Sequence, residues 1–188
     1  HFYLGEAYRQ LKKYNLAIKA FKNTVKINKD HPSAFLLLGI SYVEIKGFEQ
    51  AKNAFKKCIK MSPDFAEAHI NLAMVHLLTG NYREGWEEYE WRLKLKTFEN
   101  DKLGKVWNGE SLTNKRLLII DEQGFGDTIN FIRFAHDFYK DDCEVILQTM
   151  PELADLMKQQ KWIKVVTTEK YDGEYDYYIY LSSIMKVI

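Results

Sequence analysis

The chain has 188 residues, of which 46% are hydrophobic and 28% charged, and its formal net charge is +1. This composition is that of an ordinary soluble globular protein. No stretch approaches the roughly 20 apolar residues of a membrane-spanning helix, so we expect no membrane span. Residues 1–64 hold 12 Lys and Arg against 5 Asp and Glu, but the lysines recur at helical spacing. That spacing favours a solvated helix face over a nucleic-acid interface.

The cysteines and histidines indicate neither a disulfide framework nor a metal site. Cys58 and Cys143 lie in different segments, so we expect two unpaired core residues and a reducing compartment, the cytoplasm. The histidines are scattered, and His69 and His76 fall on packing positions. The chain begins at His1 with a repeat already under way, so we expect a fragment of a longer protein.

Residues 1–95 repeat themselves at an offset of 34 residues. Two columns of small residues and one aromatic column recur: Gly5, Gly39 and Ala73; Ala17, Ala51 and Gly85; Phe21, Phe55 and Tyr89. Small residues let the two helices of a hairpin cross closely, and aromatic side chains fill the space between hairpins. We therefore predict three helical hairpins, at about 1–31, 32–65 and 66–95.

This pattern resembles the tetratricopeptide repeat in its period and in its small and aromatic positions. Pro63 ends the second repeat as that family expects, whereas Lys29 holds the corresponding position of the first. The resemblance implies a concave face lined by the first helix of each hairpin. That face is apolar here, without the Lys and Asn cluster that clamps a peptide carboxylate: Leu36, Ile40, Val43, Ile70, Met74, Leu77 and Leu78. We expect this groove to bind an apolar peptide or to pack against another part of the molecule.

Residues 96–115 read as an irregular connector that is packed rather than flexible. Its apolar residues would be costly to leave in water: Phe98, Leu103, Val106, Trp107 and Leu112. Tryptophans at such a junction usually pack. We therefore expect Trp86, Trp91 and Trp107 to join the helical array to the segment that follows it.

From residue 116 the pattern changes to alternating strands and helices. We predict strands over Leu117–Ile120, Cys143–Leu147, Ile163–Val166 and Tyr175–Leu181, with helices over Thr128–Tyr139 and Pro151–Gln159. Alternating βα units imply a parallel, doubly wound sheet. Residues 116–188 are therefore predicted to form a partial Rossmann-like parallel α/β domain.

The turn after the first of these strands is the candidate site of that domain. Ligands bind beyond the carboxyl ends of parallel strands, where residues 123–127 would lie. The turn is not a dinucleotide fingerprint, because Ile129 holds the third glycine position. A phosphate-binding Walker loop is also excluded, since no Gly-Lys-Ser/Thr follows.

The strand followed by Glu-Gln-Gly-Phe-Gly-Asp-Thr, after an array closing in Gly-Trp-x-x-Tyr-Glu-Trp-Arg, resembles a known combination. It is similar to bacterial tetratricopeptide-repeat proteins with a heptosyltransferase-like glycosyltransferase domain of the two-Rossmann-domain (GT-B) class. The resemblance implies that Asp127 deprotonates an acceptor hydroxyl and that Gln123, Gly124, Gly126 and Thr128 contact substrate. It implies no bound cofactor, and a nucleotide-sugar donor in the full-length protein. The alternative is that Asp127 only caps the helix.

Three functional hypotheses follow. The first is the N-terminal part of a repeat-containing glycosyltransferase, whose repeats recruit a protein or glycan acceptor. Such a chain is expected to be inactive by itself, because a second Rossmann domain must hold the donor. The alternative is a non-enzymatic scaffold for protein–protein interaction. A third hypothesis is a nucleotide- or phosphate-binding regulator that uses the turn at residues 124–127.

Overall fold

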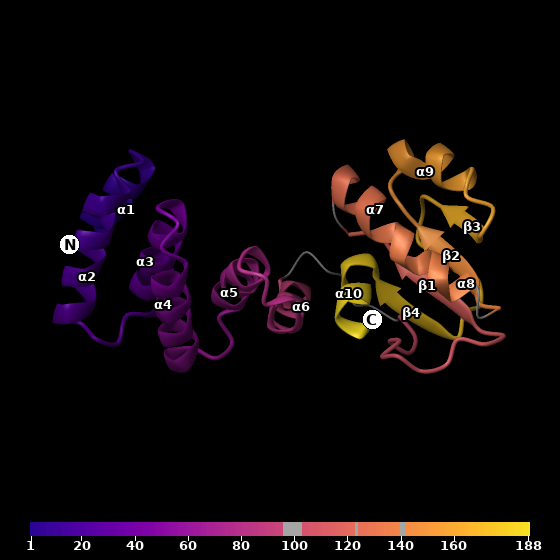
Figure 1. Ribbon diagram of the computed structural model, residues 1–188, viewed down its shortest axis with the longest axis horizontal. Coiled ribbons are helices and arrows are strands. Elements are labelled where there is room, and N and C mark those ends of the chain that lie inside the picture. Colours follow the sequence, from indigo (N-terminus) through magenta and orange to yellow (C-terminus); the bar gives the residue numbers. More distant parts are fainter. Residues whose placement is uncertain (96–102, 123, 140–141) are drawn as a thin grey trace. The chain divides into compact units, whose positions relative to one another are not determined.

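The computed structural model describes residues 1–95, 103–122, 124–139 and 142–188. The chain divides into two compact units, His1–Phe98 and Glu99–Ile188 (Figure 1). Each unit has its own buried core. Within the described ranges, no helix has both the length and the apolar character needed to cross a membrane. Cys58 and Cys143 are buried free thiols, as the sequence predicted.

The first unit consists of three helical hairpins, as the repeat predicted. Their helices are α1 (Phe2–Gln10) with α2 (Tyr14–Ile27), α3 (Pro32–Glu44) with α4 (Phe48–Met61), and α5 (Ala66–Leu78) with α6 (Tyr82–Tyr89). The second helix of each hairpin packs on the first helix of the next, and the first helices also contact one another. Each hairpin thus buries its apolar face against its neighbours, which is why consecutive repeats stabilise each other.

The glycines of the repeat mark the closest approach of helices within a hairpin. A Cβ atom added at Gly5 would lie 2.6 Å from the ring of Phe21, and Gly39 faces Phe55 in the same way. Both phenylalanines are fully buried. An added Cβ at Gly85 would lie 2.6 Å from Cδ2 of Leu77. The small and aromatic columns of the sequence therefore meet across the hairpin.

A short 3-10 helix, η1 (Glu90–Lys94), closes the third hairpin against α5. The Trp91 ring stacks on His69, with centroids 3.7 Å apart and an interplanar angle of 6°. His69 is held on both sides, by Glu88 Oε2 at 2.5 Å from Nδ1 and by the Pro63 carbonyl at 2.8 Å from Nε2. The structure therefore gives Trp91 a role within the first unit, as a cap on the repeats.

The second unit contains a parallel sheet of four strands in the order β3-β2-β1-β4. Its strands are β1 (Arg116–Ile120), β2 (Glu144–Gln148), β3 (Ile163–Thr167) and β4 (Tyr177–Tyr180). Between them run α7 (Phe125–Ile132), η2 (Arg133–Ala135), α8 (His136–Tyr139) and α9 (Pro151–Lys158). After β4 come η3 (Leu181–Ser183) and α10 (Ile184–Val187). β1 pairs with β4 in parallel, so their carboxyl ends lie side by side, and the order in which strands are added reverses between these two strands.

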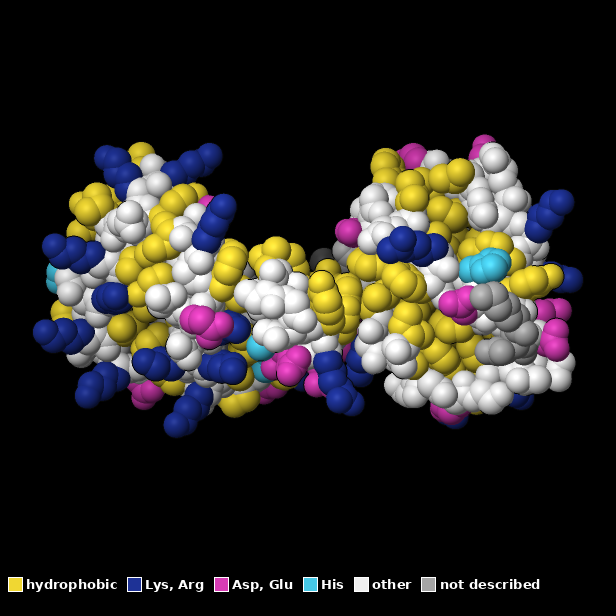
Figure 2. All heavy atoms as spheres, viewed as in Figure 1, with side chains coloured by type: hydrophobic (Ala, Val, Ile, Leu, Met, Phe, Trp, Pro, Cys, Tyr) yellow, Lys and Arg dark blue, Asp and Glu magenta, His cyan; other side chains and the backbone are white. Residues whose placement is uncertain are grey.

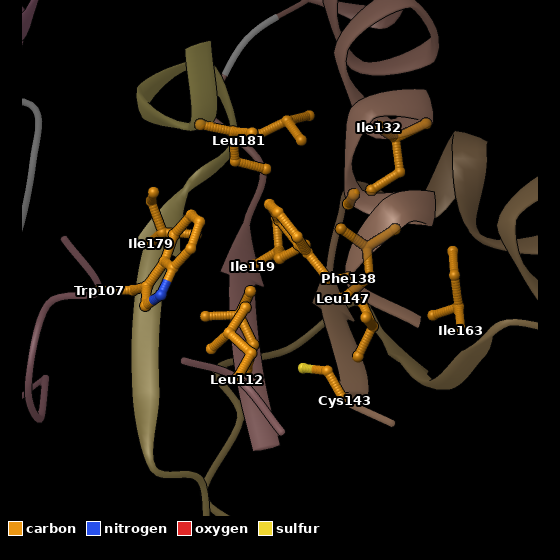
Figure 3. Close-up of a cluster of buried hydrophobic side chains, with 14 of the residues drawn as sticks. Trp107, Leu112, Ile119, Ile132, Phe138, Cys143, Leu147, Ile163, Ile179 and Leu181 are labelled. Atoms are coloured by element: carbon orange, nitrogen blue, oxygen red, sulfur yellow. The ribbon is translucent and has the colours of Figure 1, made fainter. Parts of the chain in front are cut away.

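The core of the second unit includes part of the predicted connector. Trp107 is 5% exposed and its ring meets Phe138 edge to face at 4.9 Å. Figure 3 shows Trp107 beside Ile179 of β4. The backbone N–H of Trp107 donates to the Tyr178 carbonyl at 2.8 Å, so this segment runs along the outer edge of β4. Leu112 is also buried, whereas Val106 is 42% exposed, contrary to the expectation that it is packed. Phe98 lies outside the described residues.

Two details differ from the sequence prediction. The first helix of the second unit begins at Phe125 rather than Thr128, because the turn after β1 is shorter than expected. The fourth strand begins at Tyr177 rather than Tyr175, and Leu181 belongs to η3. The parallel sheet is confirmed, and residues 168–176 between β3 and β4 contain no helix, where the sequence predicted none.

Candidate functional site

The turn after β1 is organised by the carboxylate of Asp121. Thr128 Oγ1 donates to Asp121 Oδ1 at 2.7 Å, and Thr149 Oγ1 donates to Asp121 Oδ2 at 2.7 Å. Both threonines are buried. Because Thr128 belongs to α7 and Thr149 follows β2, one side chain ties together the ends of two strands and the first turn of a helix. Charge-assisted hydrogen bonds of this kind are stronger than those between neutral groups.

Glu122 crosses to the end of β4. Its carboxylate accepts hydrogen bonds from the backbone N–H groups of Leu181 at 3.1 Å and Ser182 at 3.3 Å. The turn after β1 and the segment after β4 are thereby joined where the strand order reverses. The Ser182 hydroxyl is buried and has no hydrogen-bond partner among the described residues.

The two glycines of the turn are not required by backbone conformation. Gly124 has φ −74° and ψ 165°, which any residue adopts, and Gly126 lies inside α7. A Cβ atom added to either glycine would meet nothing within 4 Å. A tight turn is therefore not the reason for glycine at these two positions. They leave open space in front of the helix end.

The structure separates the predicted substrate residues. Asp127 is exposed in the first turn of α7, whose N-cap residue is Gly124 and makes no side-chain capping bond. Asp127 is thus not the cap, although a carboxylate there interacts favourably with the helix dipole. Thr128 donates to Asp121 and is 0% exposed. Its hydroxyl therefore does not face a ligand, contrary to the prediction that it contacts substrate. Gln123 lies outside the described residues.

Sequence reasoning missed the roles of Asp121, Glu122 and Thr149. Asp121 and Glu122 were visible directly after a strand, a position that indicates a ligand-binding edge in a parallel sheet. Thr149 carried no signal, because only the pairing of β1 with β2 brings it to Asp121. Among the residues that the structure describes, no group of three or more His, Cys, Asp or Glu side chains is placed to hold a metal ion.

The predicted apolar groove of the first unit is narrower than the sequence suggested. Leu36 is 9% exposed and belongs to the core, and Ile40 and Val43 pack against the same cluster. Leu77 is half-buried, with Gly85 against its side chain. On α5, by contrast, Met74 is 47% and Leu78 is 62% exposed.

The exposed part of the groove is thus one face of α5. Met74 and Leu78 are exposed and Ile70 is half-buried, and the three follow one another at intervals of one helical turn, so they share a side of the helix. The positions one repeat earlier are Leu36, Ile40 and Glu44, on α3. Figure 2 shows hydrophobic side chains at the surface of this unit, interspersed with Lys and Arg. We call Ile70, Met74 and Leu78 the α5 stripe.

Comparison with protein families identifies the repeats. Residues 5–46 match the family described as TPR repeat, and residues 32–65 and 54–87 match families described as tetratricopeptide repeat. Protein FlbA of Caulobacter vibrioides is 37% identical over 68 residues, which are 35% of this chain. The chain spans only 11% of the length of that relative.

Solved structures with similar helices also cover about half of the chain. The Arabidopsis OM64 TPR domain has 18% identity over 50% of this chain and 78% of its own, with a TM-score of 0.49. MamA has 25% identity over 50% of this chain and 56% of its own, with a TM-score of 0.49. The first TPR of Spaghetti (RPAP3), solved with the HSP90 peptide SRMEEVD, has 18% identity over 51% of this chain and 76% of its own, with a TM-score of 0.49.

Proposed function

We propose that the first unit is a protein-interaction scaffold that binds a partner through the α5 stripe. The proposal starts from the match of residues 5–87 to tetratricopeptide repeats. The observation that carries this proposal is the exposure of Met74 and Leu78 beside a well-packed core. The same helix buries Leu72, Ala73 and Val75, so its apolar residues are otherwise used for packing. Adjacent exposed apolar side chains are typical of an interaction surface.

The chemistry of this surface favours an apolar segment in the partner. The stripe itself carries no charge. The position on α3 that corresponds to Leu78 one repeat earlier is the acidic Glu44, which is exposed. A peptide with an acidic C-terminus would therefore meet no lysine along the stripe and would be repelled by Glu44. An amphipathic segment that inserts two or three aliphatic side chains fits better.

This function is tested by selecting peptides from a displayed random library, with the whole chain as bait. We expect selected peptides to be rich in Leu, Ile, Met and Phe and to lose at least tenfold in affinity for the Leu78→Glu variant, because a buried unpaired charge is costly. The control is Leu16→Glu on α2, the same change at another exposed leucine of the repeats, at 44% against 62% for Leu78. The proposal fails if no peptide binds, or if both variants weaken binding equally.

A second candidate function concerns the turn after β1. We infer that the second unit is the acceptor side of a nucleotide-sugar transferase, with Asp127 as general base. The supporting observation is that Gly124 and Gly126 leave space unfilled beside the exposed carboxylate, although neither packing nor conformation requires glycine there. The order β3-β2-β1-β4, with the turn beside the reversal, agrees with ligand sites in doubly wound sheets. Asp121 and Glu122 then act as positioning residues that fix the turn.

Activity of a longer protein that contains this chain tests the transferase proposal. Asp127→Asn is expected to lower kcat by a factor of about 100 or more with little change in KM, because it removes a base but keeps the shape. Asp155→Asn, an equally conservative change at an exposed position of α9, is the control. The 188-residue chain alone is expected to show no turnover. Unchanged transfer by Asp127→Asn excludes the residue from the mechanism.

A further inference from the structure

A groove separates the α7–η2–α8 segment from α9 in the second unit. It has a volume of about 440 Å³, within the range of small-molecule sites. One side of it is lined by four residues at helical spacing: Ile129 and Ile132 of α7, Arg133 of η2 and His136 of α8. Leu156 and Met157 of α9 line it as well, and Trp162 follows that helix. This groove belongs to neither of the sites described above.

The walls of this groove are apolar and accessible. Ile129 is 49% and Leu156 is 42% exposed, while Ile132 and Met157 are buried beneath them in the core. Helices that cover one sheet usually bury such side chains against each other. Here Ile129 and Leu156 remain exposed, and an aliphatic chain that binds between them would cover both side chains. Each methylene group of such a chain that is removed from water adds to the affinity.

The polar side chains that line the groove are those of Arg133, His136 and Gln160. Arg133 has no acidic partner within ion-pair distance among the described residues, and its guanidinium lies over the Phe134 ring at 4.8 Å. His136 meets the edge of Trp162 at 5.6 Å and adds a second nitrogen-bearing side chain. None of the residues that line the groove is acidic. A guanidinium that is free to make two parallel hydrogen bonds suits a carboxylate.

We propose that this groove binds an aliphatic carboxylate. The hydrocarbon chain lies between Ile129 and Leu156, and the carboxylate accepts hydrogen bonds from Arg133. The apolar walls and the single unpaired cation together fit an amphiphile with one negative head group better than a neutral or cationic one. This site shares no residue with the peptide-binding and transferase proposals, so its test is separate from theirs.

Titration of the isotope-labelled chain with decanoate, below its micelle concentration, tests the site by NMR. The indole N–H signal of Trp162, identified by its loss in Trp162→Phe, and the methyl signals of Ile129 are expected to shift in a saturable manner. Decanol and decyltrimethylammonium measure the contribution of the head group. We expect both to bind at least tenfold more weakly than decanoate, since a hydrogen bond to a charged group is worth that factor or more.

Two variants separate head group from chain. Arg133→Gln is expected to weaken decanoate about tenfold and to leave decanol unchanged. Leu156→Gln is expected to weaken both probes. Arg83→Gln, the same change at a 90% exposed side chain of the first unit, is the control and is expected to change neither affinity. Equal binding of the three probes overturns the anionic selectivity, and the absence of any saturable shift at Trp162 overturns the site.

Discussion

At the scale of single residues, burial decides what chemistry a side chain has available. Cys58 is 0% exposed in the core of the repeats, and burial, together with the nearby charge of Glu67, raises its thiol pKa from 9.0 to about 11. Thiolate is the reactive form, so a buried neutral thiol is inert. The sequence predicted an unpaired core cysteine here, and the same burial explains why it is not a reactive one.

We predict that Cys58 resists alkylation in the native protein at pH 8 and reacts fully once the first unit is unfolded in urea. Its raised pKa also contributes stability that is fully present below pH 9.0 and is lost as the pH rises towards about 11. Cys58→Ala removes that part of the pH dependence. Mass spectrometry of the alkylated peptide measures the first effect, and urea unfolding across this pH range measures the second. Rapid labelling of native Cys58 contradicts the prediction.

At the scale of helices, glycines serve two different purposes in the two units. Gly39 lies where the α3 backbone meets the buried ring of Phe55, so the hairpin cannot close around a larger residue. Gly126 lies in the first turn of α7 with open space around it. Sequence alone marked both as notable. Only the packing shows that Gly39 is needed for two helices to approach each other, whereas Gly126 is not needed by the helix that contains it.

Matched alanine substitutions test this distinction. Gly39→Ala is expected to lower the free energy of unfolding of the first unit by about 1–3 kcal/mol, because the added methyl group overpacks the core. Gly126→Ala is expected to be neutral or to stabilise by up to about 1 kcal/mol, since alanine favours helix and nothing opposes its methyl group. Urea denaturation followed by circular dichroism measures both changes. A destabilised Gly126→Ala variant means that the turn is more tightly packed than described.

At the scale of the whole molecule, the chain is two units with separate buried clusters. Phe55 lies in a cluster formed only by helices of the repeats, and Ile119 lies in the cluster formed by the sheet and its helices. Both side chains are fully buried. Because none of the residues that the structure describes belongs to the clusters of both units, each unit has its own basis for cooperative folding.

We predict that substitutions in one core lower the unfolding temperature of that unit alone. Phe55→Ala is expected to destabilise the repeats by about 3–5 kcal/mol and Ile119→Ala the sheet by about 2–5 kcal/mol, through lost burial and the cavity left behind. Differential scanning calorimetry resolves the two transitions, and the transition that each variant shifts is thereby assigned to the unit that carries the substitution. A single transition that shifts in both variants contradicts independent folding.

The sequence by itself determined the local elements of this protein. The period of the repeat, the small and aromatic columns and the apolar runs at Leu117–Ile120 and Ile163–Val166 each follow from interactions between near neighbours, and the structure contains the elements that they predict. Tertiary structure decided what no local pattern encodes. Pairing of β1 with β2 brings Thr149 to Asp121, and the packing of α3 and α4 buries Leu36 while α5 leaves Met74 and Leu78 exposed. Side chains distant in sequence meet only when the elements pack, so local periodicity cannot tell which apolar residue faces a neighbour and which faces a partner.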